Sequence, residues 1–109
     1  MSDSKNLDGA DLRGADLRGA DLRDANLTHA NLRGADLRDS QLPDANLTGA
    51  NLQFADCSST NLRRAILDDA NFWRADLSFA DLTDASIEKT KFSDALLQDA
   101  VTGTLVIES

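Results

Sequence analysis

The sequence predicts an all-β solenoid, a chain that winds into a stack of coils. Leucine-type residues recur every five positions from Leu7 to Leu97, nineteen times without a change of phase. We call these residues the centres of the repeats. A period of five suits neither regular element, because it would scatter the centres around an α-helix and alternate them between the two faces of a flat strand. The other positions are rich in Asp, Asn, Gly, Ser and Thr, which are typical of tight turns. A chain that bends once per repeat keeps every centre inside, and we therefore expect a solenoid.

The inward positions follow from the spacing within each repeat. Fifteen of the nineteen centres are leucine, and the residue two before the centre is alanine in fifteen repeats. Residues two apart point to the same side of an extended chain, so we expect both to face inward. The residue between them and the two after the centre are expected to face solvent. The exceptions at the alanine position, which leave the register unchanged, are Lys5, Ser40, Thr60 and Thr90.

The period alone does not fix how many repeats close one coil. One internal clue favours four, because Phe72 and Phe92 are both centres and lie 20 residues apart. With four repeats per coil, these two side chains would stack directly on one another.

The repeats ADLRG, ANLTH, ANLRG, ADLSF and ADLTD are similar to those of the pentapeptide-repeat family, whose motif is A(D/N)LXX. The resemblance extends over residues 5–99 and implies a right-handed quadrilateral parallel β-helix with four pentapeptides per coil, hence about five four-sided coils. On this basis we expect residues 1–4 to be a disordered or fraying amino terminus and residues 5–102 to be the β-helix. Residues 103–109 are expected to form a tail that caps the helix or pairs with a second copy.

The composition narrows the classes of function. Eleven basic and nineteen acidic residues give a net charge of −8, which argues against direct nucleic-acid binding because such proteins carry a basic face. The amino terminus lacks the apolar core of a signal peptide, and no apolar run approaches the ~18 residues of a membrane span. We expect a cytoplasmic protein without membrane association, although earlier removal of a presequence would leave the same chain.

One column of carboxylates could form a metal site. Aspartates recur every 20 residues and should align on one face, where they could attract Ca²⁺. The favoured interpretation is that each is a solvated turn residue, paired in the first coils with the arginine two residues later. The aspartates are Asp16, Asp36, Asp56 and Asp76, and the expected pairs are Asp16 with Arg18 and Asp36 with Arg38.

No other group of residues indicates catalysis. His29, the only histidine, is expected at an outward corner between Gly9 and Gly49 without a partner for acid–base chemistry. Cys57, the only cysteine, occupies a centre and is expected to be a buried, inert thiol. With no phosphate-binding loop, no paired Cys/His spacing and a core filled by leucine, we expect no catalytic residues, cofactor or metal, and no enzyme.

Apolar residues at outward positions are the informative departures from the motif. Three of the five aromatic residues occupy the positions after a centre and should face solvent. Aromatic residues together with arginine are common anchors of protein interfaces. The candidate interface residues are Phe54, Trp73, Arg74, Phe79, Leu96, Val101, Leu105, Val106 and Ile107, and Ile66 also breaks the motif.

The last segment, GTLVIES, leaves the repeat pattern. The ends of a solenoid expose backbone donors and core side chains and need capping. Its β-forming residues Leu105, Val106 and Ile107 could close the carboxyl-terminal end or pair with another copy. We therefore hypothesise a homodimer joined through this end.

Two classes of function remain. The first is a non-enzymatic, acidic scaffold that binds an unknown protein partner. The second is implied by the resemblance, because some pentapeptide-repeat proteins mimic DNA and protect or inhibit DNA gyrase. The charge density favours the scaffold. Spread along the stack of coils, the net charge amounts to one charge per about 3 Å of length, whereas B-DNA carries one per about 1.7 Å of its axis. The family is widespread in bacteria, particularly cyanobacteria, and most members have no assigned role.

Overall fold

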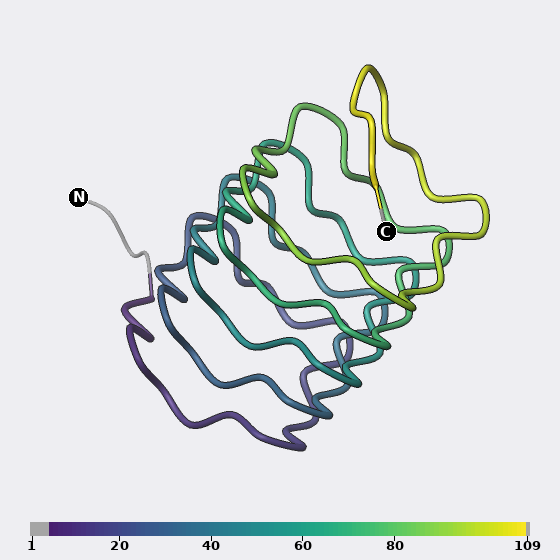
Figure 1. The fold of residues 1–109 in the computed structure, drawn as a ribbon. Helices are drawn as coiled ribbons and strands as arrows, with labels where there is room; N and C mark the ends of the chain where they lie inside the picture. Colours follow the sequence, from purple (N-terminus) through teal and green to yellow (C-terminus); the bar gives the residue numbers. More distant parts are fainter. Residues whose placement is uncertain (1–4, 109) are drawn as a thin grey trace.

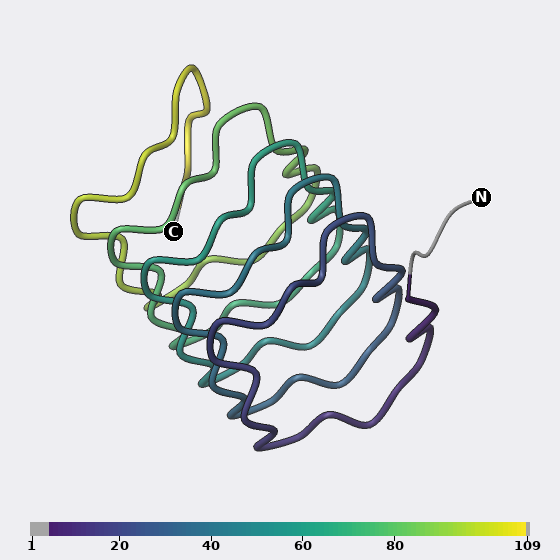
Figure 2. The same ribbon diagram turned by 180° about the vertical axis from the view of Figure 1, so that it is seen from behind.

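The chain winds into a stack of four-sided coils, as Figures 1 and 2 show from opposite sides. The computed structural model describes residues 5–108. Neighbouring coils are joined by sixteen isolated parallel β-bridges, from Asn6↔Asn26 to Asp81↔Val101, and each bridge joins residues 20 apart. Four repeats therefore close one coil, as the spacing of Phe72 and Phe92 predicted.

Each repeat contributes one bridge residue and one β-turn. Over residues 5–108 the structure has no helix, and each pairing between coils is a single bridge residue, the one directly before the centre. The turn is closed by a backbone hydrogen bond in which Ala10 N donates to the Leu7 carbonyl at 3.0 Å, and the other repeats follow the same pattern. The five-residue period is thus one step along a face followed by one corner.

Backbone hydrogen bonds between coils hold the stack together. Leu7 N donates to the Asn26 carbonyl at 2.7 Å, and Asn26 N donates back to the Lys5 carbonyl at 2.8 Å. At the corner, Gly9 N donates to the Thr28 carbonyl at 2.8 Å. Because these bonds recur along the faces, the backbone of an interior coil is satisfied by its two neighbours, as a buried backbone requires.

Every corner uses a left-handed backbone conformation. The second residue after the centre has a φ between 57° and 69° in all nineteen repeats, which is the sign that a turn of type II requires at its third residue. Glycine adopts this conformation without strain, but only five of the nineteen corners carry it. Two of the others carry phenylalanine, Phe54 with φ 61° and Phe79 with φ 62°, an unusual choice for a bulky side chain.

The core is a column of centres surrounded by small residues. From Leu22 to Leu82 every centre is buried, and the alanines from Ala25 to Ala85 are buried with them. Two buried exceptions at the alanine position keep their hydroxyls satisfied: Ser40 Oγ donates to the Leu37 carbonyl at 2.7 Å, and Thr60 Oγ1 donates to the same oxygen at 2.9 Å. Only a small residue fits here, and a hydroxyl fits when it reaches a carbonyl.

The two ends of the stack differ. At the amino-terminal end the centres Leu7, Leu12 and Leu17 are only partly buried. At the other end the tail folds back across the last coil, where Leu105 and Ile107 pack against the core (Figure 1).

Candidate interaction surface

Four flat faces arise because each coil places one repeat on each side of the stack. We call one of them the aromatic face; it consists of residues 11–14, 31–34, 51–54, 71–74 and 91–94. Its charged residues are four cations and two anions, so this face is net positive in a protein of net charge −8. These residues are Arg13, Arg33, Arg74 and Lys91, with Asp11 and Asp94.

The adjoining face, which we call the acidic face, has the opposite character. It consists of residues 16–19, 36–39, 56–59, 76–79 and 96–99, and it carries six aspartates against two arginines. These are Asp16, Asp36, Asp39, Asp56, Asp76 and Asp99, with Arg18 and Arg38. The molecule therefore changes the sign of its surface charge across one corner.

Four side chains of the aromatic face form a continuous contact that we call the aromatic ladder, Arg33–Phe54–Trp73–Arg74. The guanidinium carbon of Arg33 lies 4.6 Å from the centroid of the Phe54 ring. The rings of Phe54 and Trp73 meet edge to face, with centroids 5.2 Å apart and planes at 76°. The guanidinium carbon of Arg74 lies 5.2 Å from the Trp73 ring. Both cation–ring distances are within the range of attractive cation–π contacts.

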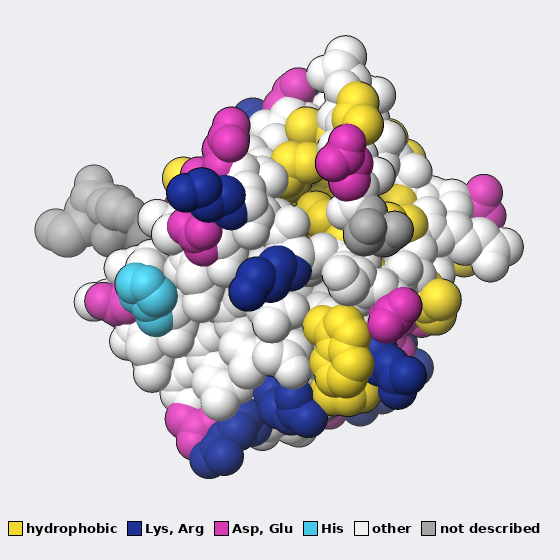
Figure 3. Space-filling view, viewed as in Figure 1, with side chains coloured by type: hydrophobic (Ala, Val, Ile, Leu, Met, Phe, Trp, Pro, Cys, Tyr) yellow, Lys and Arg dark blue, Asp and Glu magenta, His cyan; other side chains and the backbone are white. Residues whose placement is uncertain are grey.

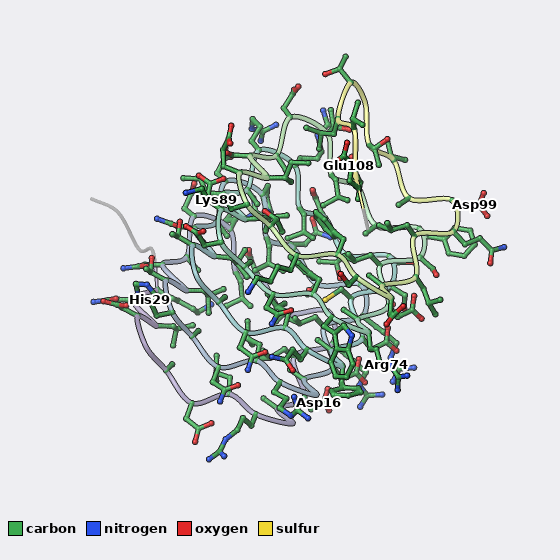
Figure 4. The ribbon with its side chains drawn as sticks, viewed as in Figure 1. Asp16, His29, Arg74, Lys89, Asp99 and Glu108 are labelled. Carbon is green, nitrogen blue, oxygen red and sulfur yellow. The ribbon has the colours of Figure 1, made fainter. Side chains whose placement is uncertain are left out.

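Polar neighbours hold two members of the ladder, Arg33 and Trp73. Arg33 Nη1 donates to Gln53 Oε1 at 2.7 Å, and Trp73 Nε1 donates to Asp94 Oδ2 at 3.3 Å. Phe54 nevertheless remains 41% exposed, while Trp73 is half-buried. Figure 3 shows an apolar patch bordered by basic side chains on this side of the molecule, and Figure 4 marks the position of Arg74. The result is a rigid aromatic surface that stays open to solvent.

The two ladder arginines differ from all the others. Six of the eight arginines form ion pairs with aspartates, whereas Arg33 and Arg74 make none with any residue from 5 to 108. The pairs are Arg13–Asp11, Arg18–Asp16, Arg23–Asp21, Arg38–Asp36, Arg63–Asp81 and Arg64–Asp44. The aromatic ladder thus holds two guanidiniums in place and leaves their charge uncompensated.

Ion pairs hold the first two aspartates of the carboxylate column on the acidic face. Arg18 and Asp16 form the expected pair at 2.9 Å, and Arg38 and Asp36 form theirs at 2.6 Å. The hydrogen bonds from the Arg18 side chain and backbone lower the pKa of Asp16 from 3.8 to about 2. No three His, Cys, Asp or Glu side chains within residues 5–108 are grouped so that they could hold a metal ion.

His29 and Cys57 lie where the sequence predicts. The imidazole of His29 lies against Gly49 of the next coil, where an added Cβ would stand 2.6 Å from His29 Cδ2. Cys57 is fully buried, and this burial raises the pKa of its thiol far above the usual value. The thiol is therefore neutral at physiological pH, and a neutral thiol is a weak nucleophile.

The remaining candidate interface residues gather near the carboxyl-terminal end, separate from the aromatic ladder. Phe79 occupies the next corner and is 58% exposed, and Val106 in the tail is 78% exposed. A hollow of about 280 Å³ opens beside the tail, with Phe92 and Ile107 among its lining residues. Leu96 and Val101 are exposed bridge residues of the last coil, and Leu105 packs inward.

The arrangement of repeats is that of a known family. Residues 6–99 match the family model "Pentapeptide repeats", in overlapping segments 6–42, 30–69, 45–84 and 67–99. The chain belongs to the pentapeptide-repeat family. It is a right-handed quadrilateral β-helix, like the solved structures of this family that it resembles.

Three solved structures illustrate how this pentapeptide-repeat protein compares. A pentapeptide repeat protein from the Arabidopsis thaliana thylakoid lumen is 30% identical, with a TM-score of 0.81 over 84% of this chain and 63% of the other. Rfr23 from the cyanobacterium Cyanothece 51142 is 26% identical, with a TM-score of 0.75 over 92% of this chain and 85% of the other. HetL from Nostoc sp. strain PCC 7120, described as involved in heterocyst differentiation regulation, is 28% identical, with a TM-score of 0.59.

The relatives are in part longer proteins. This chain spans 63% of the length of the Arabidopsis protein and 56% of the length of HetL. In the comparison with HetL, 88% of this chain is aligned. No curated protein matches it significantly. Over the described residues, the pentapeptide-repeat protein contains no helix of the length and apolar character needed to cross a membrane.

Sequence reasoning missed two members of the site, Arg33 and Asp94. Residues 19 apart lie on neighbouring coils in adjacent columns, so the contact of Phe54 with Trp73 on this diagonal could be derived from the period. The neighbouring diagonal of 21 residues places Arg33 on Phe54 and Trp73 on Asp94. Counting both diagonals around each exposed aromatic residue would have found them.

Proposed function

We propose that this pentapeptide-repeat protein is a non-enzymatic scaffold that binds another protein through the aromatic ladder. The observation that supports this most strongly is the placement of Phe54, which stands at a left-handed corner and is 41% exposed. This position adds little to the core, and the left-handed conformation costs a non-glycine residue about 1–2 kcal/mol. An aromatic residue at such a site is explained by contact with a partner, for which aromatic and arginine side chains are favoured anchors.

The same geometry offers little to an enzyme. The interior is filled by centres and alanines, so it leaves no room for a substrate. The buried thiol of Cys57 is neutral, and the arginines of the acidic face engage the first carboxylates of its column. Binding by a rigid, prearranged surface is therefore the function that these residues favour.

A capture experiment tests this proposal. The immobilised wild type is compared with Phe54→Ser/Trp73→Ser, and with Phe79→Ser as a matched control that removes an exposed aromatic residue from another corner. We expect the same proteins to be retained by the wild type and the control and lost from the double variant. Identical sets of retained proteins on all three would contradict the proposal.

We also propose a second copy of the chain as a partner at the carboxyl-terminal end. Val106 is 78% exposed beside a hollow lined by Phe92 and Ile107, an arrangement that two copies could fill reciprocally. This homodimer does not use the aromatic ladder, so the two proposed surfaces are compatible. The cytoplasmic location expected from the sequence stays a prediction.

Mimicry of DNA towards gyrase is the alternative function, and the acidic face is the feature that favours it. Against it, Arg18 bridges Asp16 and Asp36, and Arg38 bridges Asp36 and Asp56. Three of the four aspartates in the column are therefore engaged by arginine, unlike the free charges of a phosphate backbone. A supercoiling assay with excess protein tests this alternative. Inhibition or protection of gyrase would establish it, and unchanged supercoiling would leave the scaffold.

A further inference from the structure

The charge pattern of the aromatic ladder indicates what kind of partner it takes, an inference that rests on the proposed function. Arginines elsewhere on this protein are neutralised by a nearby aspartate, and the exceptions among residues 5–108 are the two that lie on aromatic rings, Arg33 and Arg74. This chain has nineteen acidic residues, yet two arginines lack a carboxylate partner, and both lie on its one net-positive face. They depart from the pairing that the other arginines follow. Each guanidinium presents a donor geometry that suits a carboxylate.

We propose that the aromatic ladder binds an acidic segment of a partner protein, in which two carboxylates bracket an apolar side chain. The apolar side chain would contact Phe54 and Trp73, and the carboxylates would pair with Arg33 and Arg74. Asp94 already accepts the indole hydrogen bond of Trp73 at 3.3 Å, so the polar edge of the ring does not compete for the ligand.

The spacing of the two arginines sets the spacing of the carboxylates. Arg33 belongs to the second coil and Arg74 to the fourth, and two steps between coils amount to about 10 Å. An extended peptide advances about 3.3 Å per residue, and its side chains share a side only at even spacings. Two acidic residues four positions apart, with the apolar residue midway, therefore present all three side chains to the ladder over about 13 Å. The long Arg and Glu side chains accommodate the difference. The rings of Phe54 and Trp73 lie between the two arginines, and the intervening apolar residue would pack against them.

Packing on the rings also prepares the arginines for binding. A free arginine loses side-chain entropy when it pairs with a ligand, and contacts that already order it reduce that loss. Arg33 is held by the Phe54 ring and by Gln53 Oε1, and Arg74 by the Trp73 ring. The surface is therefore arranged before the partner arrives, which favours affinity without a conformational change.

A nucleic acid fits this surface less well than an acidic peptide. A single strand carries a charge on every nucleotide, and the acidic face begins one corner away from Arg74. A short peptide places its charges only at the two arginines.

The test uses Trp73, which is the only tryptophan in a chain without tyrosine, so that its fluorescence reports on the ladder alone. The probes are short acetylated and amidated peptides in which one Phe lies between two Glu residues, with the Glu spacing varied from two to five positions. The same peptides with Gln in place of Glu are the control ligands, and oligo-dT is the nucleic-acid probe. Binding is measured at low and at physiological ionic strength.

The matched variants separate a local charge effect from a change in net charge. Arg33→Gln/Arg74→Gln removes the two ladder charges, and Arg63→Gln/Arg64→Gln removes two charges from the opposite face. All four side chains are exposed, and thermal unfolding checks that both variants remain folded. We expect the Glu peptides to bind best at a spacing of four with Phe midway, and the Gln peptides to bind about tenfold more weakly. Only the ladder variant should lose about tenfold in affinity.

Three results would overturn the inference: no Glu peptide binds, both variants weaken binding equally, or oligo-dT binds more tightly than every peptide. The capture experiment above is independent of this outcome. Partners that require Phe54 and Trp73 but not Arg33 and Arg74 would support the scaffold and contradict the acidic segment.

Discussion

Phe72 and Phe92 stack in the core with ring centroids 5.4 Å apart and planes within 10° of parallel. They lie 20 residues apart, so their contact records the length of one coil directly. The separation is close to the spacing of neighbouring strands in a sheet, about 4.8 Å, which shows that one coil rests on the next without an intervening layer. Side chains at equivalent positions therefore form columns, and the surface and the core can be read column by column.

The alanine column leaves no room for larger residues. Ala50 is 1% exposed, and we expect Ala50→Leu to overpack the corner and lower the free energy of unfolding by about 1–3 kcal/mol. Leu52→Ala, which opens a cavity in the same repeat, should cost about 2–5 kcal/mol. Gln53→Leu, at an outward position, is the control and should change little. Equal melting temperatures for Ala50→Leu and the wild type would show that Ala50 does not face the core.

The repeat made the core and the fold predictable, because every centre and every alanine obeys the same register. The four repeats per coil could be inferred from Phe72 and Phe92, since large side chains in a narrow core must be accommodated together. The contact of Arg33 with Phe54 was not foreseen, because it lies on a diagonal between coils and depends on how two long side chains turn. The packing of Leu105 and Ile107 was left open for a different reason: the tail has no repeat to fix its register.

The phenylalanine at the corner of the repeat ADLSF, Phe79, is expected to be dispensable for stability. Phe79 has φ 62° and is 58% exposed, so it gains little from burial and strains the corner. We expect Phe79→Gly to leave the free energy of unfolding unchanged or to raise it by up to about 1 kcal/mol, because glycine adopts this conformation without a Cβ clash. Leu77→Ala in the same repeat should cost about 2–5 kcal/mol. A loss above about 1 kcal/mol in urea unfolding of Phe79→Gly would assign this residue a structural role.

Two of the corners provide a matched pair of glycines. Gly34 and Gly49 have nearly equal φ values of 68° and 69°, but a Cβ at Gly34 meets nothing within 4 Å, whereas one at Gly49 stands 2.6 Å from the His29 ring. Both alanine substitutions should cost about 1–2 kcal/mol for the left-handed backbone. Gly49→Ala should cost a few tenths of a kcal/mol more, because His29 must turn away. The difference should disappear in a His29→Ala background, and its persistence there would remove His29 as the cause.

Acid should weaken the fold through its aspartate–arginine pairs. Arg18 lowers the pKa of Asp16 from 3.8 to about 2, and hydrogen bonds from Arg38 lower that of Asp36. A carboxylate with a lowered pKa in the folded state contributes stability above its unfolded pKa and loses it as the pH falls through the folded value. We therefore expect the melting temperature to be level from pH 7 to about pH 5 and to fall between about pH 4 and pH 2.

Removing the arginines shows whether the pairs cause this acid response. Arg18→Gln/Arg38→Gln should flatten the fall between about pH 4 and pH 2, because the two aspartates then titrate near their ordinary values in both states. Arg33→Gln is the control, since Arg33 makes no ion pair with a described residue. An unchanged acid response in the double variant would assign the effect to other carboxylates.

Self-association is expected to depend on the exposed side chain in the carboxyl-terminal tail. Leu105 and Ile107 pack against the core, so their substitution would disturb the end of the stack itself, whereas Val106 points outward and is 78% exposed. A lysine at Val106 would place a charge in the contact between two copies and is expected to prevent dimerisation without changing the melting temperature of the monomer. Sedimentation of the wild type at high micromolar concentration should show a dimer, and Val106→Lys a monomer. A wild type that sediments as a monomer would exclude the dimer, and a dimeric Val106→Lys would move its interface away from the tail.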